Sequence, residues 1–259
     1  MVETYRMKQP VEWRDRFDVI AAVDPAFTSD GDNAVIVFAK VGMNVEGTMT
    51  ICFHRKEMLK IEASSKLPIV QQIVEQVRDL CDEEGVSIDN IGFDDSGNQS
   101  VADAYEMLLG RPGVYRVNFA AKAPDSPVSA VNPMPSSQRY KNMVTWLYYS
   151  VLEFAQRGQI RGLFDETCDQ FCNRRLGQKQ KPLTLVSKKE YKRRLNVGSP
   201  DEADACAIAV GLARERLGLM PGSSEFFPQG VAFPISEYNN FGLMKKLNNL
   251  GTSYLTSRR

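Results

Sequence analysis

The order of apolar segments constrains the fold of this chain more than any other feature. Three apolar segments, at residues 18–23, 34–41 and 48–54, are separated by short turn-rich connections. Such spacing is typical of strands that pair as an antiparallel meander. The segments that follow alternate between helix and strand periodicity, at residues 69–85 (helix), 88–94 (strand), 101–109 (helix) and 114–119 (strand). Strands connected through helices pair in parallel, so we expect an α/β fold with a mixed sheet of five or more strands flanked by helices.

The second half of the chain adds mainly helices. Four prolines interrupt residues 123–135, which predicts a mobile loop. Apolar residues at helical spacing predict a long helix at 137–157 and a shorter one at 163–176. A short strand is predicted at 183–186, and a final helix begins after Ser199. We expect residues 18–217 to form the main domain, preceded by an extension at 1–17 and followed by a weakly structured tail at 218–259.

Charge is balanced overall but segregated along the chain. The 32 basic and 32 acidic residues give no net field that would attract nucleic acid or a membrane. Residues 75–106, however, carry ten acids against Arg78 alone, and residues 170–199 carry nine bases against Glu190 alone. This polarity is compatible with an acidic site beside a basic track, or with two solvated helical faces.

The number of cysteines and the lengths of the apolar runs indicate the cellular compartment. Five scattered cysteines, an odd number, favour a reducing environment. The first residues lack the apolar core of a signal peptide, and no run of about 18 apolar residues occurs. We therefore expect a cytoplasmic protein that is neither secreted nor associated with a membrane.

Aspartates occupy the ends of predicted strands. Asp24 ends the first strand, before Pro25, while Asp94 and Asp95 end the fourth. Strand alternation places Asp94 on the face opposite Phe93. The carboxyl ends of strands in α/β sheets are where binding sites collect, so these positions are candidates for function.

A further acidic group opens the final helix. Ser199 is a natural N-cap, Pro200 suits the first helical position, and Glu202 would complete a capping box. Asp201 and Asp204 are three residues apart and project from the same side of the first turn. The small residues that follow would let this helix lie close to a sheet.

These acids suit a metal centre. Asp residues commonly cap helices or occupy turns, and a structural role of this kind is the interpretation that we prefer for Glu202. For Asp24, Asp94 and Asp201 together we favour metal binding, because the chain has a single histidine and no Ser–His pairing. Two Mg²⁺ or Mn²⁺ ions about 4 Å apart could activate a water and stabilise the leaving oxygen of a phosphodiester.

Four segments, taken together, resemble the nuclease domain of the large terminase subunit of tailed bacteriophages. They are IAAVDPA at 20–26, IGFDDSGNQSVAD at 91–103, RYKNMVTWLYYSVLEFAQRGQIRG at 139–162 and KKEYKRRLNVGSPDEADACAIA at 188–209. They occur in the expected order from about residue 18 to 215. The last segment, with its basic lead-in, is the most specific of the four.

This resemblance implies an RNase H-like fold and a metal-dependent endonuclease that cuts concatemeric viral DNA during genome packaging in the host cytoplasm. Asp24, Asp94 and Asp201 match the family's catalytic, metal-binding acids. Asp204 matches a further family acid. Asp95 stands where a small residue is expected, and is an alternative ligand or a neighbour of one.

The resemblance also implies partners. Double-stranded DNA is the expected substrate, held by basic residues whose phosphate contacts position a duplex without reading its sequence. The candidates are Lys188, Lys189, Lys192, Arg193 and Arg194. The packaging ATPase motor, the small terminase subunit and the portal are the expected protein partners. The chain has no GxxxxGK[ST] motif, so we expect no motor activity of its own.

Three other functions stay open at the level of sequence. A junction resolvase or transposase of the same fold would use the same acids. An actin-like or sugar-kinase ATPase also begins with a strand, an Asp and a polar turn, but DDSGNQS is a poor second phosphate loop. A packaging adaptor would bind DNA or the portal through its basic stretch, without metal or strand scission.

Overall fold

A computed structural model describes residues 6, 10–25, 34–97, 100–178 and 182–224. Within these residues, six strands form the central sheet, in the order β5-β4-β1-β2-β3-β8. The strands are β1 (Asp18–Asp24), β2 (Val35–Met43), β3 (Met49–Met58), β4 (Ile91–Asp94), β5 (Tyr115–Val117) and β8 (Ile160–Arg161). β1, β2 and β3 pair antiparallel, whereas β4 pairs parallel to β1, β5 parallel to β4, and β8 parallel to β3. The predicted mixed sheet, an antiparallel meander extended by parallel strands, is confirmed.

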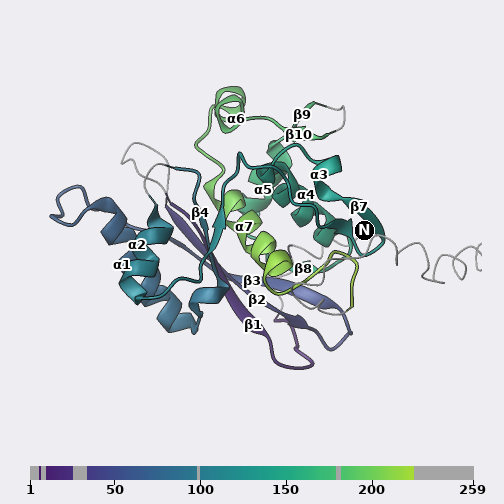
Figure 1. Ribbon diagram of the computed structural model, residues 1–259, viewed down its shortest axis with the longest axis horizontal. Helices are drawn as coiled ribbons and strands as arrows, with labels where there is room; N and C mark the ends of the chain where they lie inside the picture. The colour runs from purple at the N-terminus through teal and green to yellow at the C-terminus, as the bar shows by residue number, and fades with distance from the viewer. Residues whose placement is uncertain (1–5, 7–9, 26–33, 98–99, 179–181, 225–259) are drawn as a thin grey trace, which may run out of the picture. The chain divides into compact units, whose positions relative to one another are not determined.

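Helices cover both faces of this sheet (Figure 1). On one face, α1 (Ile69–Glu84) and α2 (Val101–Leu109) pack over β1 and β4, and the short 3-10 turn η2 (Ile88–Asn90) leads into β4. Both helices end at left-handed glycines, Gly85 and Gly110, as the sequence predicts. On the other face lie α7 (Asp201–Glu215) and, packed against it, α4 (Met143–Gln156).

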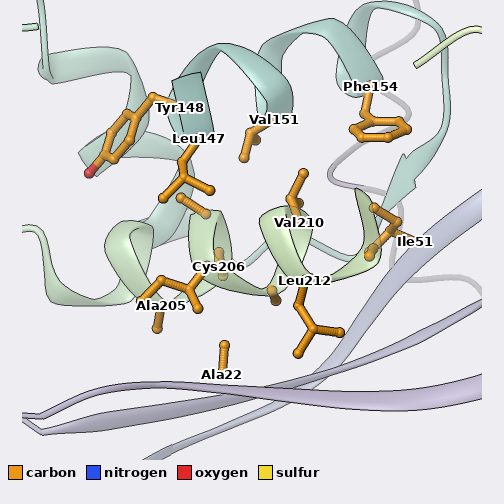
Figure 2. Packing of buried hydrophobic residues seen from close by; sticks show 14 of the residues in the cluster. Ala22, Ile51, Leu147, Tyr148, Val151, Phe154, Ala205, Cys206, Val210 and Leu212 are labelled. Carbon is orange, nitrogen blue, oxygen red and sulfur yellow. The ribbon is translucent and has the colours of Figure 1, made fainter. Parts of the chain in front are cut away.

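The close approach of α7 to the sheet depends on small residues. Figure 2 shows Ala205, Cys206 and Val210 of α7 between Ala22 of β1 and the side chains of α4. A Cβ atom on Gly92 of β4 would lie 2.8 Å from Ile208 Cγ2, so only glycine fits there. The prediction that small residues let this helix lie against the sheet is confirmed. Because α7 is buried nearly all round, its position is fixed by packing on two sides.

Three expectations for the second half were wrong. The stretch 123–135 contains a hairpin, β6 (Pro127–Ser129) and β7 (Asn132–Pro135), because these prolines lie in a small two-stranded pairing away from the central sheet. The long helix divides into α3 (Ser136–Arg139) and α4, since Asn142 caps α4 by accepting from the Thr145 N–H. The shorter helix is α5 (Asp165–Asn173), and its last predicted residues form β9 (Leu176–Gln178), which pairs with β10 (Thr184–Leu185).

Chain segments flanking the main sheet also pack on it. Trp13 bridges Asn44, next to the β2–β3 turn. Leu219 and Met220 are buried, and the Gly222 N–H donates to Gln159 Oε1 at 2.6 Å. Most of the turn-rich connection after the first strand, residues 26–33, and most of the predicted tail, 225–259, lie outside the described residues. No helix of the described residues has the length and hydropathy to cross a membrane.

Candidate active site at the carboxyl ends of β1 and β4

Register places Asp24 and Asp94 side by side. Along β1, Ala21 and Val23 pack with the α1–α2 face, so Asp24 points to the α7 face, as Ala22 does. The same alternation along β4 sends Asp94 to the α7 face. The parallel pair Val23↔Phe93 is the last before both aspartates, which therefore end adjacent strands on the same face.

The first turn of α7 brings two more carboxylates to the same edge. Asp201 is 7% exposed and Asp204 is fully buried. The expected capping box is wrong, because Pro200 occupies the N-cap position and no side chain caps the helix. Glu202 instead accepts from Lys56 Nζ at 2.8 Å and from Thr167 Oγ1 at 3.0 Å, and so links α7 to β3 and α5.

Lys188 lies among these carboxylates. Its Nζ is 2.8 Å from Asp204 Oδ2, 3.3 Å from Asp24 Oδ2 and 4.0 Å from Asp201 Oδ1. Lys188 is the first residue of α6 (Lys188–Leu195), which Ser187 caps by accepting from the Glu190 N–H. β1 and the consecutive helices α6 and α7, which are distant from β1 in sequence, therefore meet at Lys188.

The electrostatics of this group are unusual. Burial raises the pKa of Asp24 well above its ordinary value, and although Lys188 opposes the shift, the neighbouring aspartates add to it. Burial also raises the pKa of Asp94, against the hydrogen bonds from Ser96. For Lys188, burial disfavours the charged form, but Asp204 and Asp24 raise its pKa. Perturbed pKa values of this kind gather at functional sites.

Asp94 and its neighbour Asp95 face different surroundings. Asp94 Oδ1 accepts from the Ser96 N–H at 2.9 Å and from the Ser96 hydroxyl, which fixes its orientation. Asp95 Oδ1 accepts from Ser100 Oγ at 3.0 Å, and Asp95 Oδ2 lies 3.5 Å from Arg116 Nη1. The structure thus joins Asp95 to α2 and β5, and does not bring it to Lys188.

Two residues that sequence reasoning missed hold Asp204. Asp204 Oδ1 accepts from Tyr148 Oη at 2.8 Å and from Arg174 Nη1 at 2.7 Å. Tyr148 belongs to α4, and Arg174 directly follows α5. No sequence signal marks them, because Tyr148 lies within an apolar helix and Arg174 within a basic stretch that suggests a solvated surface.

The donor set suits a hard divalent cation. Asp204 Oδ2 is buried and makes no hydrogen bond of good geometry, although Lys188 Nζ is near. The acidic side chains that meet at Lys188 are all carboxylates, whose oxygens are the ligands that Mg²⁺ and Mn²⁺ prefer. Within the described part of the chain, no three or more His, Cys, Asp or Glu side chains are arranged so that they could hold a metal ion as they stand. The carboxylates here surround an ammonium group instead.

The other predicted bases lie along α6. Lys189 and Arg193 are exposed, and Arg193 pairs with Glu190. Arg194 donates to the backbone carbonyl of Asn173, and Lys192 is partly exposed. Apart from Lys188, the bases of this helix are therefore at or near the surface beside the carboxylates.

Comparison with known proteins identifies the fold. No protein family and no curated protein matches the sequence. The nuclease domain of the large terminase subunit gp2 of bacterial virus Sf6 has 17% identity and a TM-score of 0.54, over 76% of this chain and 90% of that domain. A mutant of the same domain with manganese and beta-thujaplicinol has 16% identity, the same coverage and the same TM-score. This chain has the RNase H-like α/β fold of the nuclease domain of a phage large terminase subunit.

Proposed function

We propose that this protein is a metal-dependent endonuclease that cuts double-stranded viral DNA during genome packaging. The observation that carries the proposal is the buried group of aspartates from β1, β4 and α7, three of which surround Lys188. A protein gains little stability from gathering buried acids, so a cluster of this kind is best explained by binding of cations. The fold of the Sf6 terminase nuclease domain supports the same function.

Each site residue has a distinct role in this proposal. Asp24, Asp94, Asp201 and Asp204 hold two Mg²⁺ or Mn²⁺ ions, which, when bound, would activate water and stabilise the leaving oxygen. Ser96 orients Asp94. Lys188 offsets part of the carboxylate charge in the metal-free protein, because its ammonium lies against Asp24 and Asp204. Asp95 is kept only as a neighbour of the site, since it is bonded to Ser100 and Arg116.

The DNA duplex would lie along α6. The surface bases Lys189, Lys192, Arg193 and Arg194 are next in sequence to Lys188, on one short helix. Their contacts with phosphates would place the scissile bond at the carboxylates, independently of base sequence. In a packaging complex the motor, the small subunit and the portal would be the partners, and would supply much of the affinity for DNA.

The test is cleavage of supercoiled plasmid by the purified chain with Mn²⁺, Mg²⁺ or EDTA. We expect metal-dependent nicking and linearisation, which Asp24→Asn abolishes. Asp103→Asn is the matched control, because Asp103 is an ion-paired aspartate of α2 that faces Arg116. Circular dichroism confirms that both variants fold. Full cleavage by folded Asp24→Asn would refute the assignment.

Further assays on the same purified protein distinguish the other activities. Preference for four-way junctions over linear DNA, measured side by side, would indicate a resolvase. DNA binding without cleavage at any metal concentration would indicate a packaging adaptor. Saturable ATP binding would favour the ATPase interpretation.

A further inference from the structure

Asp204 is held in place by two buried side chains, Arg174 and Tyr148. Arg174 Nη1 donates both to Asp204 Oδ1, at 2.7 Å, and to Tyr148 Oη, at 2.8 Å. Tyr148 Oη donates in turn to Asp204 Oδ1. The Arg174 guanidinium also lies over the Tyr148 ring, 4.6 Å from its centroid. The arginine side chain is 3% exposed and the Asp204 side chain is fully buried. Figure 2 shows Tyr148 reaching from α4 toward the beginning of α7.

The two carboxylate oxygens of Asp204 make different contacts. Oδ1 is saturated by Arg174 and Tyr148, so the carboxylate cannot rotate without breaking two buried hydrogen bonds. Oδ2 is left facing Lys188, without a hydrogen bond of good geometry. The carboxylate therefore presents a single, fixed oxygen to the site.

Another buried arginine shows what a purely structural role looks like. Arg214 is also over an aromatic ring, 4.9 Å from the centroid of Trp146, and is 7% exposed. Its guanidinium donates to Ser150 Oγ at 2.7 Å and to the Pro127 carbonyl at 2.6 Å, which ties α7 to α4 and the β6–β7 hairpin. Arg174 has similar burial and the same kind of aromatic support, but its charge is directed at a carboxylate of the site.

We propose that Arg174 and Tyr148 are positioning residues, which fix Asp204 Oδ1 so that Oδ2 is presented to the divalent cation. This inference rests on the proposed metal-dependent function. Replacing a buried ion pair by apolar residues is often neutral for stability, so stability alone does not account for the pair. Hydrogen-bond partners that orient metal ligands typically change metal affinity about 10-fold to 100-fold when removed.

The test is Mn²⁺ binding without DNA, measured by calorimetry and by the electron paramagnetic resonance of free Mn²⁺. The variants are Tyr148→Phe, which keeps the ring and loses the donor, and Arg174→Lys. Both positions border a cavity of about 270 Å³, so the substitutions meet no closely packed wall on that side. Arg214→Lys is the matched control. We expect Mn²⁺ affinity to fall about 10-fold or more in the first two variants and to stay unchanged in the control.

The outcomes separate this inference from the proposed function. Thermal unfolding reports folding, and if Arg174→Lys does not fold, Tyr148→Phe decides. Wild-type Mn²⁺ affinity in folded Tyr148→Phe would overturn the positioning role while leaving the nuclease intact. Equal loss in Arg214→Lys would show a general effect of core disruption and would also overturn it. If the wild type and Asp24→Asn bind Mn²⁺ equally and neither nicks plasmid, both the function and the positioning role fall.

Discussion

Two groups of carboxylates in this protein each surround a single cation, yet they behave in opposite ways. In the site cluster, Asp24, Asp201 and Asp204 lie within 4.0 Å of Lys188, with Asp94 beside them on β4. In the Arg116 network, Asp95, Asp103 and Glu106 lie within 3.5 Å of Arg116. The two cations are similarly exposed, with side-chain fractions of 34% and 32%.

The pKa values of Asp24 and Asp94 shift in the opposite direction from those of Asp103 and Glu106. In the site cluster, burial raises the pKa of Asp24 and of Asp94. In the Arg116 network, the hydrogen bond from Arg116 lowers the pKa of Asp103. Burial opposes the shift of Glu106, but hydrogen bonds from the Gly113 N–H and from Arg116 lower its pKa. With one cation in each group, the charged forms of Asp24 and Asp94 are thus disfavoured, whereas those of Asp103 and Glu106 are favoured.

Burial explains the difference. The site carboxylates that contact Lys188 are at most 10% exposed, whereas those of the Arg116 network are 18% to 62% exposed. Water screens and solvates the second group, so it forms an ordinary surface network. The first group loses hydration that one ammonium does not replace, and would be relieved by divalent cations.

The largest effect should separate two adjacent residues. Asp94→Asn should reduce Mn²⁺-dependent plasmid cleavage at least about 1,000-fold, because a direct ligand contributes more than the 10- to 100-fold typical of its supports. Asp95→Asn should reduce cleavage less than about 10-fold, since Asp95 is bonded to Ser100 and Arg116. The comparison is of initial nicking rates at saturating metal. Equal losses of cleavage in the two variants would mean that Asp95 belongs to the site cluster, and would contradict the distinction between the two groups.

A smaller effect concerns the bases beside the site cluster. Lys189→Ala/Lys192→Ala should weaken DNA binding about 10-fold at low salt, and should reduce the slope of log K against log salt by about one for each phosphate that the two lysines neutralise. Binding is measured on catalytically inactive Asp24→Asn, without metal. Arg111→Ala is the control, because Arg111 is an exposed base at the acidic α1–α2 side. A similar loss of affinity in the control would mean that DNA does not lie along α6.

In the metal-free protein, the unfavourable burial of the site carboxylates should affect the free energy of unfolding. The raised pKa of Asp24 means that the folded state holds its proton at pH values where the unfolded state has lost it. Stability should therefore fall as the pH rises from about 4, the ordinary aspartate value, through the raised value. In EDTA at pH 7, Asp24→Asn should be more stable than the wild type, because the variant keeps no buried carboxylate charge at this position. Urea unfolding at several pH values measures this, and a less stable variant at pH 7 would contradict it.

The smallest effect should come from the Arg116 network, with the opposite dependence on pH. Glu106 has a lowered pKa, so its contribution to stability is present above its ordinary pKa and is lost as the pH falls. Glu106→Gln should destabilise the protein by less than about 1 kcal/mol at pH 7, and should leave cleavage unchanged. The same urea series tests both groups. Matching pH dependences for Asp24→Asn and Glu106→Gln would remove the contrast between them.

Much of the fold could be predicted from local patterns. The strands near residues 18, 34 and 48 and the helices at 69 and 101 follow from apolar periodicity and from glycine ends, and the structure has them at these places. The break before α4 could not be predicted in this way, because periodicity continues through it and the Asn142 cap decides. The hairpin at 127–135 was missed because its prolines suggest an irregular loop.

Glu202 and Lys188 show the limit of local reasoning about the site. Glu202 fits a capping box in sequence but bonds to Lys56 of β3, more than a hundred residues away. Lys188 belongs to a basic run, yet its ammonium lies among the carboxylates rather than in solvent with Lys189. The contacts of Glu202 with Lys56 and of Lys188 with Asp24 are set by how α6 and α7 pack on the rest of the protein, and no nearby residue encodes them.

The sequence by itself determined where the acids stand along the chain: at the ends of two strands and in the first turn of a helix. Strand alternation and helical spacing act over a few residues, so these placements are readable without a fold. Only the tertiary structure decided which acids meet, because the β1–β4 register and the approach of α7 over Gly92 bring them to one point. The tertiary structure also decided that Arg174 and Tyr148 hold Asp204. The effect of a charged side chain depends on its burial and on where its charge points, and both are set only when segments distant in sequence pack together.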